Sequence, residues 1–167
     1  NARTATASLN GLIISGPLRG TEFNPDGTTF AHDYGVYGGV AYYGVFTNCL
    51  FYGNAARSYG GAVYSVTMHG CTVTGNVASL GGGVYSSTCY DCMIAGNESP
   101  GSGGGAYGGA LTDCTLSGNT AEYGGGAYNG TLTNCTLTRN QADLGGGAHS
   151  CTLTNCILTG NQATEYG

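Results

Sequence analysis

The segment GGGAYNGTLTNCTLTRNQADL spans residues 124–144 and is followed directly by GGGAHSCTLTNCILTGNQATEY, residues 145–166. Earlier copies of the same pattern begin at Gly38, Gly60, Gly81 and Gly103. All six copies align without internal gaps when the first glycine is taken as position 1, and the period is 21 or 22 residues. A fixed period of this length is typical of solenoids, in which each repeat forms one turn of a stack.

Apolar side chains return at positions 4, 9 and 14 of every copy. Position 14, for example, holds Phe51, Val73, Ile94, Leu116, Leu137 and Leu158. Thr, Ser and Asn fill the positions between, so that TLTNCTLT alternates polar and apolar residues as a half-buried strand does. No window of the chain shows the period of a helix, and the sequence therefore predicts short strands.

Three places in each copy predict a bend of the backbone. Position 11 is Asn or Asp in five copies, positions 16–17 are usually Gly-Asn, and positions 1–3 are rich in glycine. Short strands joined by bends once per period describe one coil of a parallel β-solenoid. A leucine-rich repeat would show a different Leu and Asn spacing, and an RTX-type calcium repeat would need an Asp inside the glycine run.

The N-terminal stretch predicts one more coil. When residue 1 is taken as position 1, positions 9, 12, 14 and 16 are filled by Leu9, Leu12, Ile14 and Gly16. Residues 17–37 then form an insertion, and residues 38–166 hold the six regular repeats. We expect a single all-β domain over residues 1–167, with about seven coils of 21–22 residues. At about 4.8 Å per coil the stack would be roughly 33 Å tall.

Two short motifs in these repeats match a known family. Gly60-Gly61-Ala62-Val63 fits GGA(I/L/V), and Phe51-Tyr52-Gly53-Asn54 fits FxxN. These paired motifs resemble those of the chlamydial polymorphic outer-membrane proteins, which are autotransporter-like adhesins. The chain also resembles the GGGAY…TLTNCTLTGN arrays of large secreted bacterial β-helix proteins in the pectate-lyase-like superfamily. The resemblance covers residues 38–166 and implies a single-stranded right-handed parallel β-helix that is secreted or exposed on the cell surface.

Two polar columns run through all six copies, one of asparagine and one of cysteine. Position 17 holds Asn54, Asn76, Asn97, Asn119, Asn140 and Asn161, and position 12 holds Cys49, Cys71, Cys92, Cys114, Cys135 and Cys156. Stacked amides hydrogen-bond along the axis, so we predict an internal asparagine ladder. The cysteines recur at a spacing that allows disulfides, for example 49–71, 92–114 and 135–156. The alternative, which we prefer, is a column of small buried apolar side chains.

A third column is aromatic. Position 5 holds Tyr42, Tyr64, Tyr85, Tyr107, Tyr128 and His149. If position 4 points inward, position 5 points outward, which predicts an aromatic stripe on the surface. Such a stripe could stack on sugar rings or pack against another protein, and self-stacking of the rings is an equally good explanation.

Groups that suggest catalysis are few. Asp91 and Asp113 share position 11 in adjacent coils, and Glu122 and Asp143 share position 20. Such pairs could bind Ca²⁺ or act as acid and base, but a polysaccharide lyase would also need a clustered Arg or Lys, and the chain has no Lys. The CxxC of Cys89 and Cys92 lacks the second pair that zinc needs. We predict no enzyme, no metal site and no cofactor.

Composition limits the partners. Charged residues make up 8% of the chain, which argues against nucleic acid and anionic lipid, and no apolar stretch is long enough to insert into a membrane. Eight cysteines are consistent with an oxidising compartment. We expect a non-catalytic extracellular structural protein, either a surface stalk or the subunit of a filament that self-associates end to end. The alternative is a carbohydrate-binding or adhesin module with glycans as partners; a polysaccharide-active enzyme and an ice-binding solenoid are more distant ones.

Overall fold

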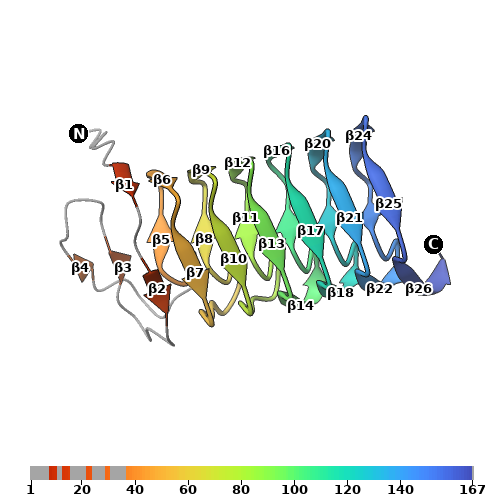
Figure 1. Cartoon of the computed structure of the whole chain (residues 1–167). Coiled ribbons are helices and arrows are strands. Elements are labelled where there is room, and N and C mark those ends of the chain that lie inside the picture. Colours follow the sequence, from red (N-terminus) through yellow and green to blue (C-terminus); the bar gives the residue numbers. More distant parts are fainter. Residues whose placement is uncertain (1–7, 11–12, 16–21, 24–28, 31–36, 167) are drawn as a thin grey trace.

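The computed structural model describes residues 8–10, 13–15, 22–23, 29–30 and 37–166. Over these residues the protein is an all-β parallel solenoid without a helix, which confirms the predicted fold class. Figure 1 shows the coils following one another along a single axis, from orange at the N-terminal side to blue at the C-terminal side. Each regular coil turns through four sides, and like sides stack into parallel sheets.

The first sheet has seven strands and is built from positions 8–10 of each coil. Its order is β1 (Ser8–Asn10), β6 (Val45–Thr47), β9 (Thr67–His69), β12 (Thr88–Tyr90), β16 (Ala110–Thr112), β20 (Thr131–Thr133) and β24 (Thr152–Thr154). The register pairs equal repeat positions, so that Cys89 lies opposite Met68 on one side and Leu111 on the other. Insertions of one residue between coils therefore leave the strand register intact.

The second sheet also has seven strands and uses positions 13–15. Its order is β2 (Ile13–Ser15), β7 (Leu50–Tyr52), β10 (Thr72–Thr74), β13 (Met93–Ala95), β17 (Thr115–Ser117), β21 (Thr136–Thr138) and β25 (Ile157–Thr159). In the first coil, Leu9 pairs with Phe46 and Ile14 with Phe51, which confirms the predicted register at positions 9 and 14. Leu12 and Gly16 lie outside the described residues.

Two narrower sheets close the coil. One contains β5 (Ala41–Tyr42), β8 (Val63–Tyr64), β11 (Val84–Tyr85), β15 (Ala106–Tyr107), β19 (Ala127–Tyr128) and β23 (Ala148–His149). The other contains β14 (Glu98–Ser102), β18 (Thr120–Tyr123), β22 (Gln141–Leu144) and β26 (Gln162–Tyr166). In the predicted insertion, β3 (Glu22–Phe23) and β4 (Thr29–Phe30) pair antiparallel. All other strand pairs in the described part of the chain are parallel.

Each regular coil turns at four corners, one more than the sequence predicted. Positions 1, 6, 11 and 16 have positive φ in all six coils. In one coil these are Gly103, Gly108, Asp113 and Gly118, with φ of 69°, 63°, 55° and 60°. Within a coil the four corners are five residues apart, because each side is one short strand with its flanking turn. Six or seven residues separate the corner at position 16 from position 1 of the next coil. The fourth corner, at position 6, is occupied by residues as different as Tyr43, Ser65 and Asn129.

Position 2 requires glycine for a different reason. A Cβ on Gly61 would collide with the carbonyl oxygen of Gly82 in the next coil, and one on Gly104 would collide with that of Thr120. Backbones approach too closely there to leave room for any side chain. The glycine run thus combines a left-handed corner at position 1 with a close approach at position 2.

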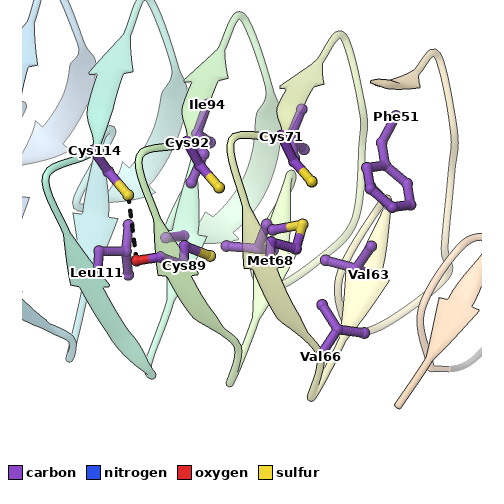
Figure 2. Close-up of a cluster of buried hydrophobic side chains, with 14 of the residues drawn as sticks. Phe51, Val63, Val66, Met68, Cys71, Cys89, Cys92, Ile94, Leu111 and Cys114 are labelled. Atoms are coloured by element: carbon purple, nitrogen blue, oxygen red, sulfur yellow. Dashed lines mark hydrogen bonds between the residues drawn. The ribbon is translucent and has the colours of Figure 1, made fainter. Parts of the chain in front are cut away.

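The core is one continuous cluster along the axis. Figure 2 shows Cys71, Cys92 and Cys114 in one row and Met68, Cys89 and Leu111 in a second row beside it. Large side chains such as Phe51, Ile94, Leu116 and Leu137 are fully buried. Burial of each such side chain stabilises the fold by about 1.5–3 kcal/mol, so the interior holds the stack together without disulfides.

Candidate functional site

The asparagine column lies inside the solenoid and forms a hydrogen-bonded ladder. Side chains from Asn54 to Asn140 are at most 1% exposed. From Asn76 onward, each Oδ1 accepts both the backbone N–H and the Nδ2–H of the asparagine one coil earlier, at 2.8–3.0 Å. Each Nδ2 from Asn76 also donates to the position-14 carbonyl of the previous coil. The ladder thereby gives a partner to the backbone N–H that directly follows the corner at position 16, which we call a corner amide.

The cysteine column is buried, and all eight cysteines are free thiols. Cys71, Cys92, Cys114 and Cys135 are 1–2% exposed, whereas Cys151 and Cys156 in the last coil are partly exposed. Each position-12 thiol donates to the carbonyl two residues earlier, at 3.2–3.5 Å. Burial therefore agrees with the preferred interpretation, but the sulfur atoms are not simple apolar filling.

The thiols of this column differ in how readily they ionise. Hydrogen bonds with neighbouring thiols, together with burial, raise the pKa of Cys71 and Cys114, and that of Cys89 at position 9, above the ordinary value of 9.0. Hydrogen bonds with neighbouring thiols lower the pKa of Cys92 and, through Cys114, lower that of Cys135 to about 7. Burial raises the pKa of Cys151. Because the thiolate is the nucleophile and the metal ligand, the raised pKa values disfavour either role at Cys71 and Cys114.

The aromatic column is half-buried and stacks on itself. Successive rings from Tyr42 to His149 have centroids 4.8–5.4 Å apart and interplanar angles of 9–27°. The ring faces are therefore turned toward the neighbouring rings along the axis, and the edges point outward. The outward exposure predicted for this stripe is only partial. Burial and the neighbouring phenols raise the pKa of Tyr85.

A second set of rings, which the sequence analysis missed, packs beside this column. Tyr37 and Tyr59 stack at 5.3 Å, and Tyr59 meets Tyr85 edge to face at 4.8 Å. At the other end, Tyr123 meets His149 at 5.8 Å. The sequence carried a signal for it, because a tyrosine directly precedes the glycine run at Tyr37, Tyr59 and Tyr123. The two sets together cover one edge of the coil with aromatic rings.

The acidic pairs lie on exposed corners and sides. Asp113 accepts a hydrogen bond from Nδ2 of Asn134 at 3.0 Å, and Asp143 accepts one from Oγ1 of Thr164 at 2.7 Å. Asp91 and Glu122 are exposed as well. Among the described residues, no group of three or more His, Cys, Asp or Glu side chains could hold a metal ion, and this includes the surroundings of Cys89 and Cys92.

Comparison with known proteins places the chain in a family. A family model described as the periplasmic copper-binding protein NosD matches residues 24–166, which include all six regular coils. The chain belongs to the NosD family. No curated protein and no solved structure gives a significant match.

NosD membership agrees with the solenoid architecture. The chain resembles the chlamydial adhesins only in two short motifs. In the part of this NosD-family chain that the structure describes, no helix has the length and apolar character needed to cross a bilayer.

Proposed function

We propose that this NosD-family chain is a non-catalytic structural element of the cell envelope or cell surface, a stalk or filament segment lengthened by stacking further coils on its end. The family's periplasmic description supports an envelope location, and secretion to the cell surface is the finer form of the proposal. The unbroken columns support a structural role, because the residues that recur in every coil contact the next coil.

One observation carries the proposal. Equal repeat positions pair in register through the six regular coils, from β6 to β24 in the first sheet and from β7 to β25 in the second. The asparagine hydrogen bonds run in one direction through the same coils, from Asn54 to Asn161. Each coil therefore offers the next coil the same strand edges and the same ladder. Strand edges of this kind are templates for pairing with another chain.

Electron microscopy of the native material tests the proposal. Unbranched fibres with an axial repeat of roughly 33 Å, seven coils at about 4.8 Å, are the expected result. Dispersed short rods at high protein concentration would overturn self-stacking. Leu153→Lys places a charge in the apolar column at position 9, in register with Leu132, and should abolish fibres. Thr152→Lys, the neighbouring outward-facing residue on β24, is the matched control and should leave them intact.

Carbohydrate binding on the aromatic stripe is the second candidate. Sugar rings stack on aromatic faces, whereas the faces of Tyr85 and Tyr107 lie against neighbouring rings at 4.8 Å. Only phenol edges and hydroxyls remain to meet a glycan. This candidate requires that Tyr107→Ala and Tyr128→Ala abolish retention on a glycan matrix while the fold survives. Unchanged retention, or none in the parent protein, counts against it.

The family description also implies copper, and the residues can be tested for fit. Thiolates favour Cu(I), and the cysteine column is the main array of such ligands in this chain. From Cys49 to Cys135 its thiols are buried and donate to backbone carbonyls. Among the described residues, no group of three or more His, Cys, Asp or Glu side chains could hold a metal ion. The residues do not fit a copper site, and the proposed function includes no step through copper.

A further inference from the structure

The cysteine corner at Cys71 and the asparagine corner at Asn76 have the same hydrogen-bond pattern. Cys71 shares its single S–H between the carbonyl two residues earlier and that of Phe46, at position 9 of the previous coil. Asn76 donates to the carbonyl two residues earlier and to Phe51, at position 14 of the previous coil. Because position 9 stands to position 12 as position 14 stands to position 17, the two side chains fill equivalent places.

The accepting side of the pattern is also shared. Sγ of Cys71 accepts the backbone N–H of Cys49 at 3.4 Å, as Oδ1 of Asn76 accepts the backbone N–H of Asn54 at 2.8 Å. In both cases the donor is the residue that directly follows a left-handed corner, Asn48 or Gly53. That amide turns into the core, where it needs a partner from the next coil.

A third corner repeats the pattern with other residues. At position 7, Oγ of Ser87 accepts the N–H of Val66 at 3.3 Å and donates to the carbonyl of Tyr85 at 3.0 Å. Cys151, also at position 7, accepts the N–H of Gly130 at 3.4 Å and donates to the carbonyl of His149 at 3.3 Å. Serine and cysteine thus exchange at one corner with both hydrogen bonds retained.

We infer that the cysteine column is a thiol hydrogen-bond ladder, equivalent to the asparagine ladder, that satisfies one corner amide per coil, and that this role withholds the thiols from copper. Sulfur is a weak acceptor and a weak donor, but its size also fills the core beside Met68 and Leu111, which a serine does less completely. Recruiting these thiols for a metal would remove the S–H donors and occupy the sulfur that accepts the corner amide, as Sγ of Cys71 accepts the N–H of Cys49. The inference is independent of whether the coils stack end to end.

Paired substitutions separate this role from that of a small apolar residue. At Cys71, which makes all three contacts, Cys71→Ser should retain the pattern, whereas Cys71→Ala should remove the sulfur that accepts the Cys49 N–H. The unfolding equilibrium constant of Cys71→Ala should exceed that of Cys71→Ser by about tenfold. Cys89 is the matched control, because it lies at position 9 between Met68 and Leu111. There the order should reverse, with alanine better tolerated than serine. The same order at both sites would overturn the inference.

Copper binding is measured with Cu(I) in competition with bicinchoninate under anaerobic reducing conditions. The protein carries Cys151→Ser and Cys156→Ser, because these two thiols are partly exposed and would obscure the buried column. The folded variant should leave the bicinchoninate complex unchanged, whereas the same chain unfolded in urea should withdraw Cu(I) through its six remaining thiols. Withdrawal of Cu(I) by the folded variant would overturn the inference.

Discussion

Oδ1 of Asn140 accepts two hydrogen bonds from Asn119, one from the backbone N–H and one from Nδ2, both at 2.9 Å. One oxygen thereby satisfies two buried donors of the preceding coil. Asn140 in turn donates through its own N–H and Nδ2 to Asn161. The bonds between successive asparagines are directional, since Asn140 accepts from the asparagine one coil earlier and donates to the asparagine one coil later.

Asn140→Ala should therefore be strongly destabilising. It leaves two donors of Asn119 without an acceptor and removes the donor to the Leu116 carbonyl. Buried groups without partners cost about 1–3 kcal/mol each, so we expect a loss of roughly 3 kcal/mol or more in the free energy of unfolding. Gln141→Ala, an exposed amide one residue further, should change it by less than about 0.5 kcal/mol. Urea denaturation followed by circular dichroism measures both, and similar losses would contradict the ladder.

A second prediction concerns the apolar column at position 14. Leu116 is fully buried between Ile94 and Leu137, its neighbours in register. Leu116→Ala should lower the free energy of unfolding by about 2–5 kcal/mol, through lost transfer energy and the cavity left behind. Thr115→Ala, on the outward side of the same strand, should change it by less than about 0.5 kcal/mol. A small effect of Leu116→Ala would show that the stack collapses around the cavity.

Most of the architecture could be predicted from the sequence, because the same residue type recurs at the same position of each coil. The apolar columns, the asparagine ladder and the register of Leu9 and Ile14 follow from matching residue types in equal positions. Stacking forces equal positions together, so a pattern that is weak in one coil becomes clear in six.

The corner at position 6 and the hydrogen bonds of the cysteines could not be predicted, because the residue types at these positions do not indicate them. The corner at position 6 is held by Tyr43, Ser65 and Asn129 alike, since closure of the coil imposes positive φ whatever the residue. Its one available signal was the spacing of the predicted corners, because positions 11 and 16 are five residues apart and positions 1 and 11 are ten. The hydrogen bonds of the cysteines were equally hidden, because sulfur in a core usually acts as an apolar group.

A third prediction concerns the left-handed corners at position 16, where a substitution changes the backbone strain without a steric clash. Gly118 has φ of 60°, and a Cβ there would meet nothing within 4 Å. Gly118→Ala should thus destabilise by about 1–2 kcal/mol through conformation rather than collision. Arg139 stands at the same position one coil later with φ of 54°. Arg139→Gly should stabilise by about 0.5–1 kcal/mol.

Thermal and urea unfolding of both variants check the signs. Gly104→Ala serves as the contrasting control, because its Cβ would collide with the carbonyl oxygen of Thr120. It should be more destabilising than Gly118→Ala. A destabilised Arg139→Gly would mean that contacts of the arginine side chain outweigh the strain at its backbone.

The buried thiols give a fourth prediction, on pH. The pKa values of Cys71, Cys89 and Cys114 are raised above 9.0, first through hydrogen bonds with neighbouring thiols and then through burial. In the unfolded chain these thiols ionise near pH 8.5–9, whereas in the folded chain they stay protonated. Their stabilising contribution is therefore complete below this range and is lost as the pH rises above it.

Each such thiol lowers the free energy of unfolding by at most about 1.4 kcal/mol per pH unit above its unfolded pKa. Stability measured by urea denaturation should thus lose the contribution of Cys71 between pH 9 and 10. The pKa values of Cys92 and Cys135 are lowered, so these two thiols contribute in the opposite direction below that range. Tyrosines also begin to ionise near pH 10, so the comparison that isolates the thiols is Cys71→Ser. Serine does not titrate, and this variant should show a shallower fall than the parent protein. Parallel curves for the two proteins would mean that Cys71 ionises equally in the folded and unfolded states.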